Sequence, residues 1–194
     1  MGSEKPQFKI GPNAILQLIP ILTETLGQSC TISLLTGAGL NKTPNENLMI
    51  DETSVAKLHR TIRRELPDLS RVIMRKAGEN TGNYILNHRI PRKVQFFLKW
   101  LPTSFSSQLL ARAIKKHSWT FSGSGTFKLI TSHIFELYDN PMIKGEINKD
   151  PICHWHAAVF ERLYQILVQA NLVCLETECK ATGAKSCRFI ISPS

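Results

Sequence analysis

The side chains best suited to bind a metal or to take part in catalysis gather between residues 153 and 187. The run CHWH at 153–156 opens an apolar segment, and Cys174, Cys179 and Cys187 follow in two short stretches with strand-like composition. Thiolates and imidazoles are the side chains that zinc most often binds, and reactive cysteines and histidines also titrate near neutral pH. Metal binding or ligand chemistry is therefore expected first in this part of the chain.

A zinc site could be assembled from four of these residues. Cys153 and His156 are three positions apart in a segment that predicts a helix, so both side chains can face one point. Cys179 and Cys187 could approach from a final hairpin and complete a tetrahedral site of three thiolates and one imidazole. The alternative is that these cysteines are small apolar core residues, because cysteine is among the most buried residue types.

Hydride transfer requires a nicotinamide or flavin, whose phosphates are commonly held by a glycine-rich turn between a strand and a helix. Gly37 and Gly39 supply the first part of such a motif, but Lys42 stands where its third glycine belongs. An iron–sulfur cluster needs four closely grouped thiolates, whereas the five cysteines are dispersed along the sequence. The residues show no motif for an electron donor, and whether the chain is an enzyme stays open here.

The elements that position these residues begin with helices. Apolar residues recur at helical spacing over residues 15–26, with a kink expected at Pro20 and a stop at Gly27. Further helices are predicted over residues 53–66, 67–88 and 105–116, with a loop around residues 37–44 and a weak middle in the third helix at residues 78–82.

The second half of the chain predicts strands around one helix. Residues 119–122 and 127–138 predict a hairpin around Gly123 and Gly125, and residues 172–179 and 187–192 predict a second hairpin. Residues 151–170 between them predict a helix. This order indicates an α+β single domain, with N-terminal helices packed on a four-stranded antiparallel sheet. The domain should span residues 11–192, with a flexible N-terminus at 1–10 and a closing signature at 170–190.

Composition describes a globular protein with a basic surface. The chain has 194 residues and a formal net charge of +9, and its basic residues concentrate in 57–76, 89–99 and 112–116. Such patches attract carboxylates, phosphates or anionic membrane surfaces, although a solvated face without a partner is the simpler alternative. Nucleic acid is not expected, since no recognition motif accompanies the charge. Without a bilayer-spanning run or a signal peptide, the expected location is the cytoplasm, with peripheral contact to a photosynthetic membrane as an option.

Several motifs together resemble a known family. The pattern Glu176-x-x-Cys179-x-x-x-Gly183-x-x-x-Cys187-x-Phe189 is similar to the closing signature of the 4-vinyl reductase domain. Residues 11–15 (GPNAI), 117–125 (HSWTFSGSG) and 153–163 (CHWHAAVFERL) narrow the resemblance to the bacteriochlorophyll 4-vinyl reductase family, the J proteins of bacteriochlorophyll biosynthesis. The resemblance covers residues 11–189. It implies a small ligand-binding domain with a fold related to that of a eukaryotic vesicle-tethering subunit.

The resemblance implies a magnesium porphyrin or protochlorophyllide-type ligand, bound between the helices and the sheet. Such a ligand needs apolar walls, anchors for its carboxylates and an axial nitrogen or water. The candidate ligand-binding residues are His88, Arg89, Arg92, His117, Trp119, Phe121, His154, Trp155, His156 and Phe160. Each of them taken alone could instead be a core or surface residue.

Three functions remain open from the sequence. The first is an accessory carrier that presents a magnesium tetrapyrrole intermediate to enzymes of the bacteriochlorophyll pathway. The second is a true divinyl (4-vinyl or 8-vinyl) reductase, as the family name implies. The third is a zinc-containing or dimerising sensor or assembly module, in which Ile15 and Leu22 could supply a homodimer face, although core positions suit both residues as well.

Overall fold

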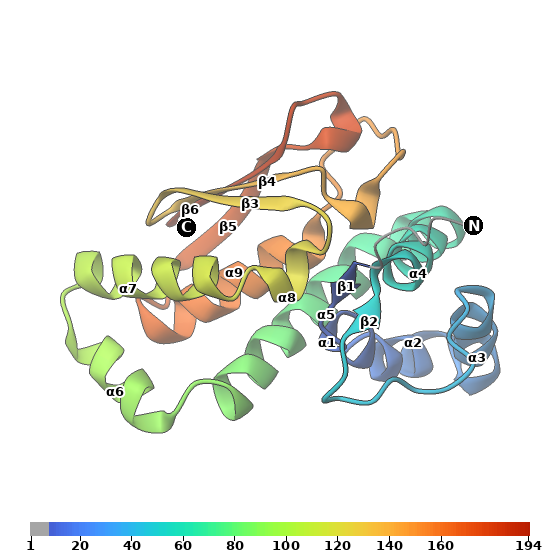
Figure 1. Ribbon diagram of the computed structural model, residues 1–194, viewed down its shortest axis with the longest axis horizontal. Coiled ribbons are helices and arrows are strands. Elements are labelled where there is room, and N and C mark those ends of the chain that lie inside the picture. Colours follow the sequence, from blue (N-terminus) through green and yellow to red (C-terminus); the bar gives the residue numbers. More distant parts are fainter. Residues whose placement is uncertain (1–7) are drawn as a thin grey trace, which may run out of the picture.

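The computed structural model describes residues 8–194 as an antiparallel sheet lying on layers of helices (Figure 1). The four-stranded sheet has the order β3-β4-β6-β5, so the last strand of the chain lies inside the sheet. Its strands are β3 (Thr126–Thr131), β4 (Ile134–Tyr138), β5 (Leu172–Glu178) and β6 (Cys187–Pro193), and α9 (His154–Leu167) joins β4 to β5. The predicted α+β fold, with its order of strand, strand, helix, strand, strand, is confirmed.

The inner face of the sheet packs on α9 through aromatic rings. The Phe160 ring centroid lies 5.1 Å from that of Phe135 on β4 and 5.4 Å from that of Phe189 on β6. Tyr164, one helical turn after Phe160, is also fully buried. Residues four apart share one face of a helix and alternate residues share one face of a strand, so this contact follows directly from the sequence pattern.

The long helix α5 (Pro67–His88) crosses the other side of α9, and two glycines make the crossing close. A β-carbon at Gly78 would lie 2.7 Å from Cβ of Ala158, and one at Gly82 would lie 2.7 Å from Cβ of Arg162. The predicted helix at 67–88 is confirmed, but residues 78–82 are not a weak middle. They are the point at which α9 approaches the backbone of α5, where only a residue without a side chain fits.

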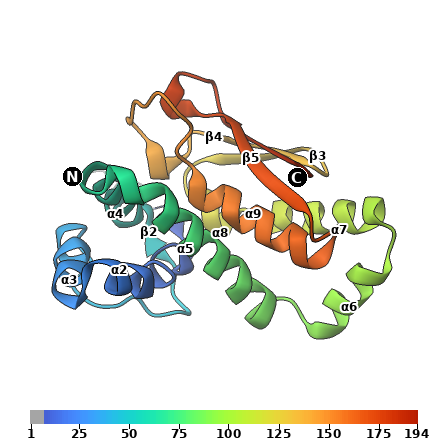
Figure 2. The ribbon, with the colours of Figure 1, turned by 180° about the vertical axis from the view of Figure 1, so that it is seen from behind.

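The remaining elements surround this core (Figures 1 and 2). The small helices of the N-terminal part pack around the first half of α5, and α6 and α7 form a corner beyond its end. Their bounds are β1 (Lys9–Ile10), α1 (Asn13–Leu16), α2 (Ile19–Leu26), α3 (Gln28–Gly37), β2 (Ile50–Asp51), α4 (Glu52–Glu65), α6 (Arg92–Trp100), α7 (Thr103–Lys116), α8 (Trp119–Ser122), and the 3₁₀ helices η1 (Pro141–Ile143) and η2 (Lys180–Thr182). Within residues 8–194, no helix has both the length and the hydropathy needed to cross a bilayer.

One predicted hairpin is placed differently in the structure. Residues 119–122 form the short helix α8, in which the N–H of Ser122 donates to the carbonyl of Ser118. Gly123, with φ of +54°, ends this helix, and the hairpin turn lies instead at residues 132–133, between β3 and β4. The aromatic content of 119–122 suggested a strand, but Phe121 is buried against Phe127 from a helical turn.

The N-terminal region also differs from the sequence prediction. Residues 28–37 form α3 rather than loop, because Gly27 ends α2 and begins the next helix with φ of +81°. The helix predicted over 15–26 is divided into α1 and α2, and Pro20 lies in the first turn of α2. Of the predicted flexible segment 1–10, residues 1–7 lie outside the described residues, while Lys9–Ile10 pair with β2.

Candidate metal centre and the adjacent groove

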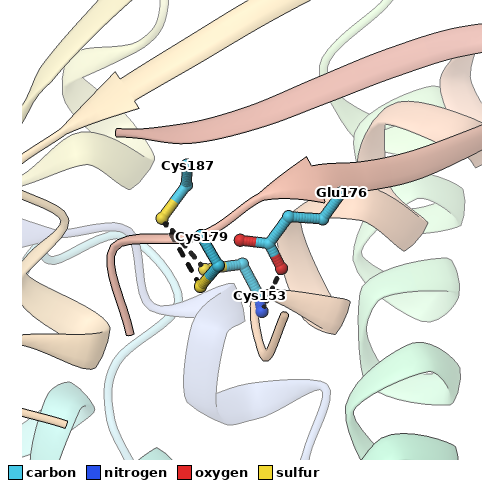
Figure 3. Close-up of side chains that lie close together, drawn as sticks. All are labelled: Cys153, Glu176, Cys179 and Cys187. Carbon is cyan, nitrogen blue, oxygen red and sulfur yellow. Dashed lines mark hydrogen bonds between the residues drawn. The ribbon is translucent and has the colours of Figure 1, made fainter. Parts of the chain in front are cut away.

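Three thiols and one carboxyl group meet where the sheet reaches the start of α9 (Figure 3). Ligand atoms of Cys153, Glu176, Cys179 and Cys187 all lie within 4.8 Å of one another. The Sγ atom of Cys187 lies 3.5 Å from Sγ of Cys153 and 4.0 Å from Sγ of Cys179. The three cysteines are buried, and we call these four residues the thiol–carboxyl cluster.

Local irregularities in three elements bring these side chains together. Cys153 is the residue before α9, outside the helical conformation, and Cys187 begins β6. On β5, Cys174 and Glu176 face inward by strand alternation, and a register shift between Glu176 and Glu178 follows. A bulge inserts one residue and changes which side chains face inward, so Cys179 also points to the helix side.

Burial determines the protonation of most of the cluster. Burial raises the pKa of the Cys153 thiol well above its usual value and raises that of the Glu176 carboxyl to about 8. In contrast, hydrogen bonds from Cys153 and then Cys187 hold the pKa of Cys179 far below its usual range. Without a metal, the cluster therefore carries its negative charge mainly on the Cys179 thiolate.

The geometry of the cluster fits a tetrahedral zinc ion. A zinc–sulfur bond of about 2.3 Å in tetrahedral geometry separates the sulfur atoms by about 3.8 Å, which lies between the two sulfur–sulfur distances of the cluster. Glu176 accepts from the N–H of Cys153 through Oε2 at 2.7 Å. Its other oxygen, Oε1, is buried without a hydrogen-bond partner among residues 8–194, and it is available as a fourth ligand. The amide of Asn140 donates to Sγ of Cys153 at 3.3 Å and provides the outer support that metal ligands commonly have.

His156 does not belong to this cluster, contrary to the site predicted from the sequence. Because α9 begins at His154, Cys153 is not helical, and the expected three-residue spacing does not place both side chains on one face. The His156 ring instead packs against Trp155, Phe121 and Phe189. Burial lowers its pKa to about 4, so the ring is neutral at pH 7. Glu176, quoted from the sequence only as part of the closing signature, takes its place.

A cavity of about 10 Å³ lies beside His156 and Trp155. His59, Arg63 and Met74 contribute to its lining, and this volume corresponds to about one water site. Nε2 of His156 and Nε1 of Trp155 are both buried without a protein partner among residues 8–194. The cavity is far too small for a macrocycle.

The space between α9 and the sheet, where the family resemblance implied a pigment, is filled by side chains. Phe160 is buried there, and the half-buried Phe121 has its ring centroid 5.6 Å from that of Phe160. Both rings belong to one aromatic cluster of the core rather than to an open wall. A large ligand would have to bind elsewhere.

A larger surface groove of about 440 Å³ lies between α5 and α9. Arg75 and Lys76 line it from α5, and Arg162 lines it from α9. Two of these cations are paired, Arg75 with Glu161 and Arg162 with Glu79, whereas Lys76 has no ion pair within residues 8–194. The remaining lining residues are Val72, Ala158 and Gln165, which supply the apolar part of the floor and an amide.

His154 stands at the end of this groove nearest the thiol–carboxyl cluster. It lies one helical turn before Ala158, and so on the groove face of α9. Burial, followed by the charges of Arg71 and Arg75, lowers the pKa of half-buried His154 to about 4. Its imidazole is therefore neutral at pH 7, the form that can coordinate a metal.

The other predicted ligand residues lie apart from the groove. His88 and Arg89 are exposed around Tyr84 at the end of α5, with the His88 ring stacked 4.5 Å from the Tyr84 ring. Arg92 begins α6 and is exposed, as are His117 and Trp119 at the far end of α7. The structure thus does not bring the predicted set together into one site.

Comparison with known proteins defines first the class and then the family. Residues 134–193, which include all four residues of the thiol–carboxyl cluster, match the model of the 4-vinyl reductase domain. Over 99% of its length the chain is 45% identical to the bacteriochlorophyll synthase 23 kDa chain of Cereibacter sphaeroides, of which it covers 94%. It is 35% identical to the protein of the same description from Rhodobacter capsulatus, with 95% of the chain and 87% of that protein covered.

The chain belongs to the family of these bacteriochlorophyll synthase 23 kDa chains, which confirms the resemblance drawn from the motifs. This membership supports involvement in bacteriochlorophyll biosynthesis.

Solved H-NOX proteins share the fold. An unliganded Fe(II) H-NOX protein from K. algicida matches with a TM-score of 0.60 at 6% identity, covering 95% of this chain and 97% of that one. The Fe(II)NO form from S. oneidensis matches with a TM-score of 0.55 at 14% identity, covering 95% and 99%. A third H-NOX structure, titled for heme distortion, gives 0.55 at 11% identity, covering 95% and 97%. At these identities the likeness establishes a common α+β architecture.

Proposed function

We propose that this protein binds a magnesium tetrapyrrole intermediate of bacteriochlorophyll biosynthesis and presents it to enzymes of that pathway. The observation that carries the proposal is the relationship, over nearly the full length, to chains described as parts of bacteriochlorophyll synthase. The shared fold supports it further, because an H-NOX structure of this fold is titled for heme distortion and heme is also a tetrapyrrole.

The groove between α5 and α9 is the proposed binding site. Its volume of about 440 Å³ lies within the range of pockets for small ligands. Lys76 and the rim arginines can pair with carboxylates of the macrocycle, and Val72 and Ala158 can contact its apolar face. Magnesium accepts a neutral imidazole as a single axial ligand, and His154 at the end of the groove is in that form at pH 7.

An absorption titration with magnesium protoporphyrin tests this proposal. We expect saturable binding with a shifted absorption band, and His154→Ala should lose the shift and weaken binding at least about tenfold, the loss of roughly 1.4 kcal/mol. His88→Ala and His117→Ala are matched controls, because both histidines are exposed and lie away from the groove. Absence of any spectral change with wild-type protein would refute the carrier function.

The same preparation distinguishes the carrier from a reductase. A carrier alone should yield no product from a divinyl substrate, with or without reduced nicotinamide or ferredoxin. Formation of monovinyl pigment by the purified protein would instead establish the reductase alternative.

A structural zinc ion in the thiol–carboxyl cluster is a second proposal, favoured by the sulfur spacing and the unpaired Oε1 of Glu176. Such an ion would fix the start of α9, and with it His154, against the final hairpin. Less than about a tenth of an equivalent of zinc in protein purified without chelator would rule the site out; the stoichiometry expected for a closed four-ligand site is one.

A further inference from the structure

The positive charge of this protein is concentrated in one stretch of the chain. Residues 80–135 contain no Asp or Glu, and they account for eight of the nine net positive charges. All eight side chains are exposed: Arg89, Arg92, Lys93, Lys99, Arg112, Lys115, Lys116 and Lys128. None of them forms an ion pair within residues 8–194, where the acidic partners of the other basic residues lie on different elements.

The same stretch exposes large apolar side chains. On α6, Phe96 is 65%, Phe97 55% and Trp100 77% exposed, and on α7 Phe105 is 59% exposed. The exposed apolar surface continues one turn further along α7 to Leu109. Isolated exposed apolar residues are ordinary, but neighbouring aromatic rings on adjoining helices indicate an interaction surface.

Cations and aromatic rings alternate around one side of α6. Phe96 and Trp100 are four residues apart with ring centroids 5.7 Å apart, and Lys93 precedes Phe97 by the same interval. The opposite side of the helix holds it to the protein, through buried Leu98 and through Gln95, whose amide donates to the carbonyls of Leu86 and Ile90. The exposed side is thus formed by a well-anchored helix.

We propose that the α6–α7 corner is a docking surface for an anionic membrane. Phe and Trp side chains of an amphipathic helix insert at the boundary between headgroups and acyl chains, while Lys and Arg between them contact anionic headgroups. The corner lies at the outer edge of the molecule, beyond the end of α5, where a flat surface can reach it (Figure 1). This surface is separate from the α5–α9 groove, so the proposal does not depend on the pigment site.

The mixture of the two kinds of side chain favours a membrane over other anionic partners. An acidic protein or a nucleic acid would account for the cations, but three exposed rings on nine residues of α6 would add little to binding a phosphate backbone in which no bases are exposed. Lipid bilayers satisfy both components, since they offer an apolar interior beneath a negative surface.

Cosedimentation with vesicles tests the surface. Wild-type protein should bind vesicles of phosphatidylcholine containing phosphatidylglycerol, should bind pure phosphatidylcholine vesicles much more weakly, and should dissociate in high salt. Lys93→Gln and Lys99→Gln should each reduce partitioning about fivefold, the equivalent of about 1 kcal/mol per surface cation. Phe96→Ser with Trp100→Ser should reduce it more than about tenfold.

Matched variants separate location from composition. Ile147→Ser removes an apolar side chain that is 96% exposed, and Lys149→Gln and Lys185→Gln remove cations elsewhere; all three should bind like wild type. Circular dichroism should show every variant folded, because none of the changed side chains is buried. Failure of wild-type protein to bind anionic vesicles at low salt would overturn the proposal, and binding to duplex DNA or polyglutamate in its place would assign the surface to a soluble partner. Full binding by the α6 variants would also overturn it.

Discussion

Gly78 on α5 lies directly against Ala158 on α9, so that a β-carbon at Gly78 would approach Cβ of Ala158 to 2.7 Å. The same β-carbon would also meet the carbonyl oxygen of Trp155. This contact sets the separation of the two helices whose facing sides form the groove. It also sets the position of the first turn of α9, which carries His154 and follows Cys153.

Gly78→Ala should destabilise the protein although alanine is the better helix former. Overpacking at a closed contact costs about 1–3 kcal/mol, whereas the gain in helix propensity is at most about 1 kcal/mol. The free energy of unfolding, measured in urea, should fall accordingly. Gly37→Ala is the control, because Gly37 has no atom within 4 Å of the added carbon, and this variant should be neutral or slightly more stable.

Removing one cluster thiol should remove the metal, whereas removing a buried thiol elsewhere should not. Cys187→Ala deletes a proposed ligand, and Cys174→Ala deletes a cysteine that is equally buried but lies outside the cluster. Both create a small cavity, so zinc content by mass spectrometry is the discriminating measurement. Equal zinc content in the two variants would contradict the proposed ligand set. Chelator should lower the melting temperature of wild type and leave that of Cys187→Ala unchanged.

Acid should destabilise the fold through buried His59. Burial, followed by the charge of Arg63, lowers the pKa of His59 to about 3, and its Nε2 pairs with the carbonyl of Ala14 at 2.9 Å. The unfolded chain takes up a proton below about pH 6.5 while the native protein does not, so stability falls as pH decreases below that value. The loss is about 2 kcal/mol at pH 5 from this group alone.

His59→Gln should flatten this dependence by about 1.4 kcal/mol per pH unit between pH 6 and pH 4, since glutamine keeps a donor but does not titrate. Urea unfolding at several pH values measures the slope. His117→Gln, at an exposed histidine, should retain the wild-type slope. A slope unchanged in His59→Gln would show that His59 is protonated in the native protein.

The rim of the groove gives a prediction for ligand charge. Lys76 has no ion pair within residues 8–194, so Lys76→Gln should weaken binding of a carboxylate-bearing magnesium porphyrin about two- to fivefold without loss of stability. Methyl esters of the same porphyrin should bind both proteins equally. Lys57→Gln on α4 serves as the control, and a similar loss with that variant would mean that the effect comes from overall charge.

Much of the fold could be predicted from the sequence. The helices at 52–65 and 67–88 and the last two strands follow from apolar periodicity, Pro67 and the residues around Gly183. Residues 119–122 were predicted wrongly as a strand, since four residues carry too weak a period to separate a helical turn from a strand. The glycines at 78 and 82 were read as helix weaknesses, because sequence alone does not reveal a neighbouring backbone.

For the candidate site, the sequence by itself determined the chemistry: soft ligands at 153, 179 and 187, and the family to which they belong. The tertiary structure alone decided that Glu176 joins them and His156 does not. The physical reason is local geometry, since the non-helical Cys153 and the register shift after Glu176 change where side chains point. It likewise decided that aromatic rings fill the interior and leave a groove outside it, because helix packing, not residue type, determines where space remains.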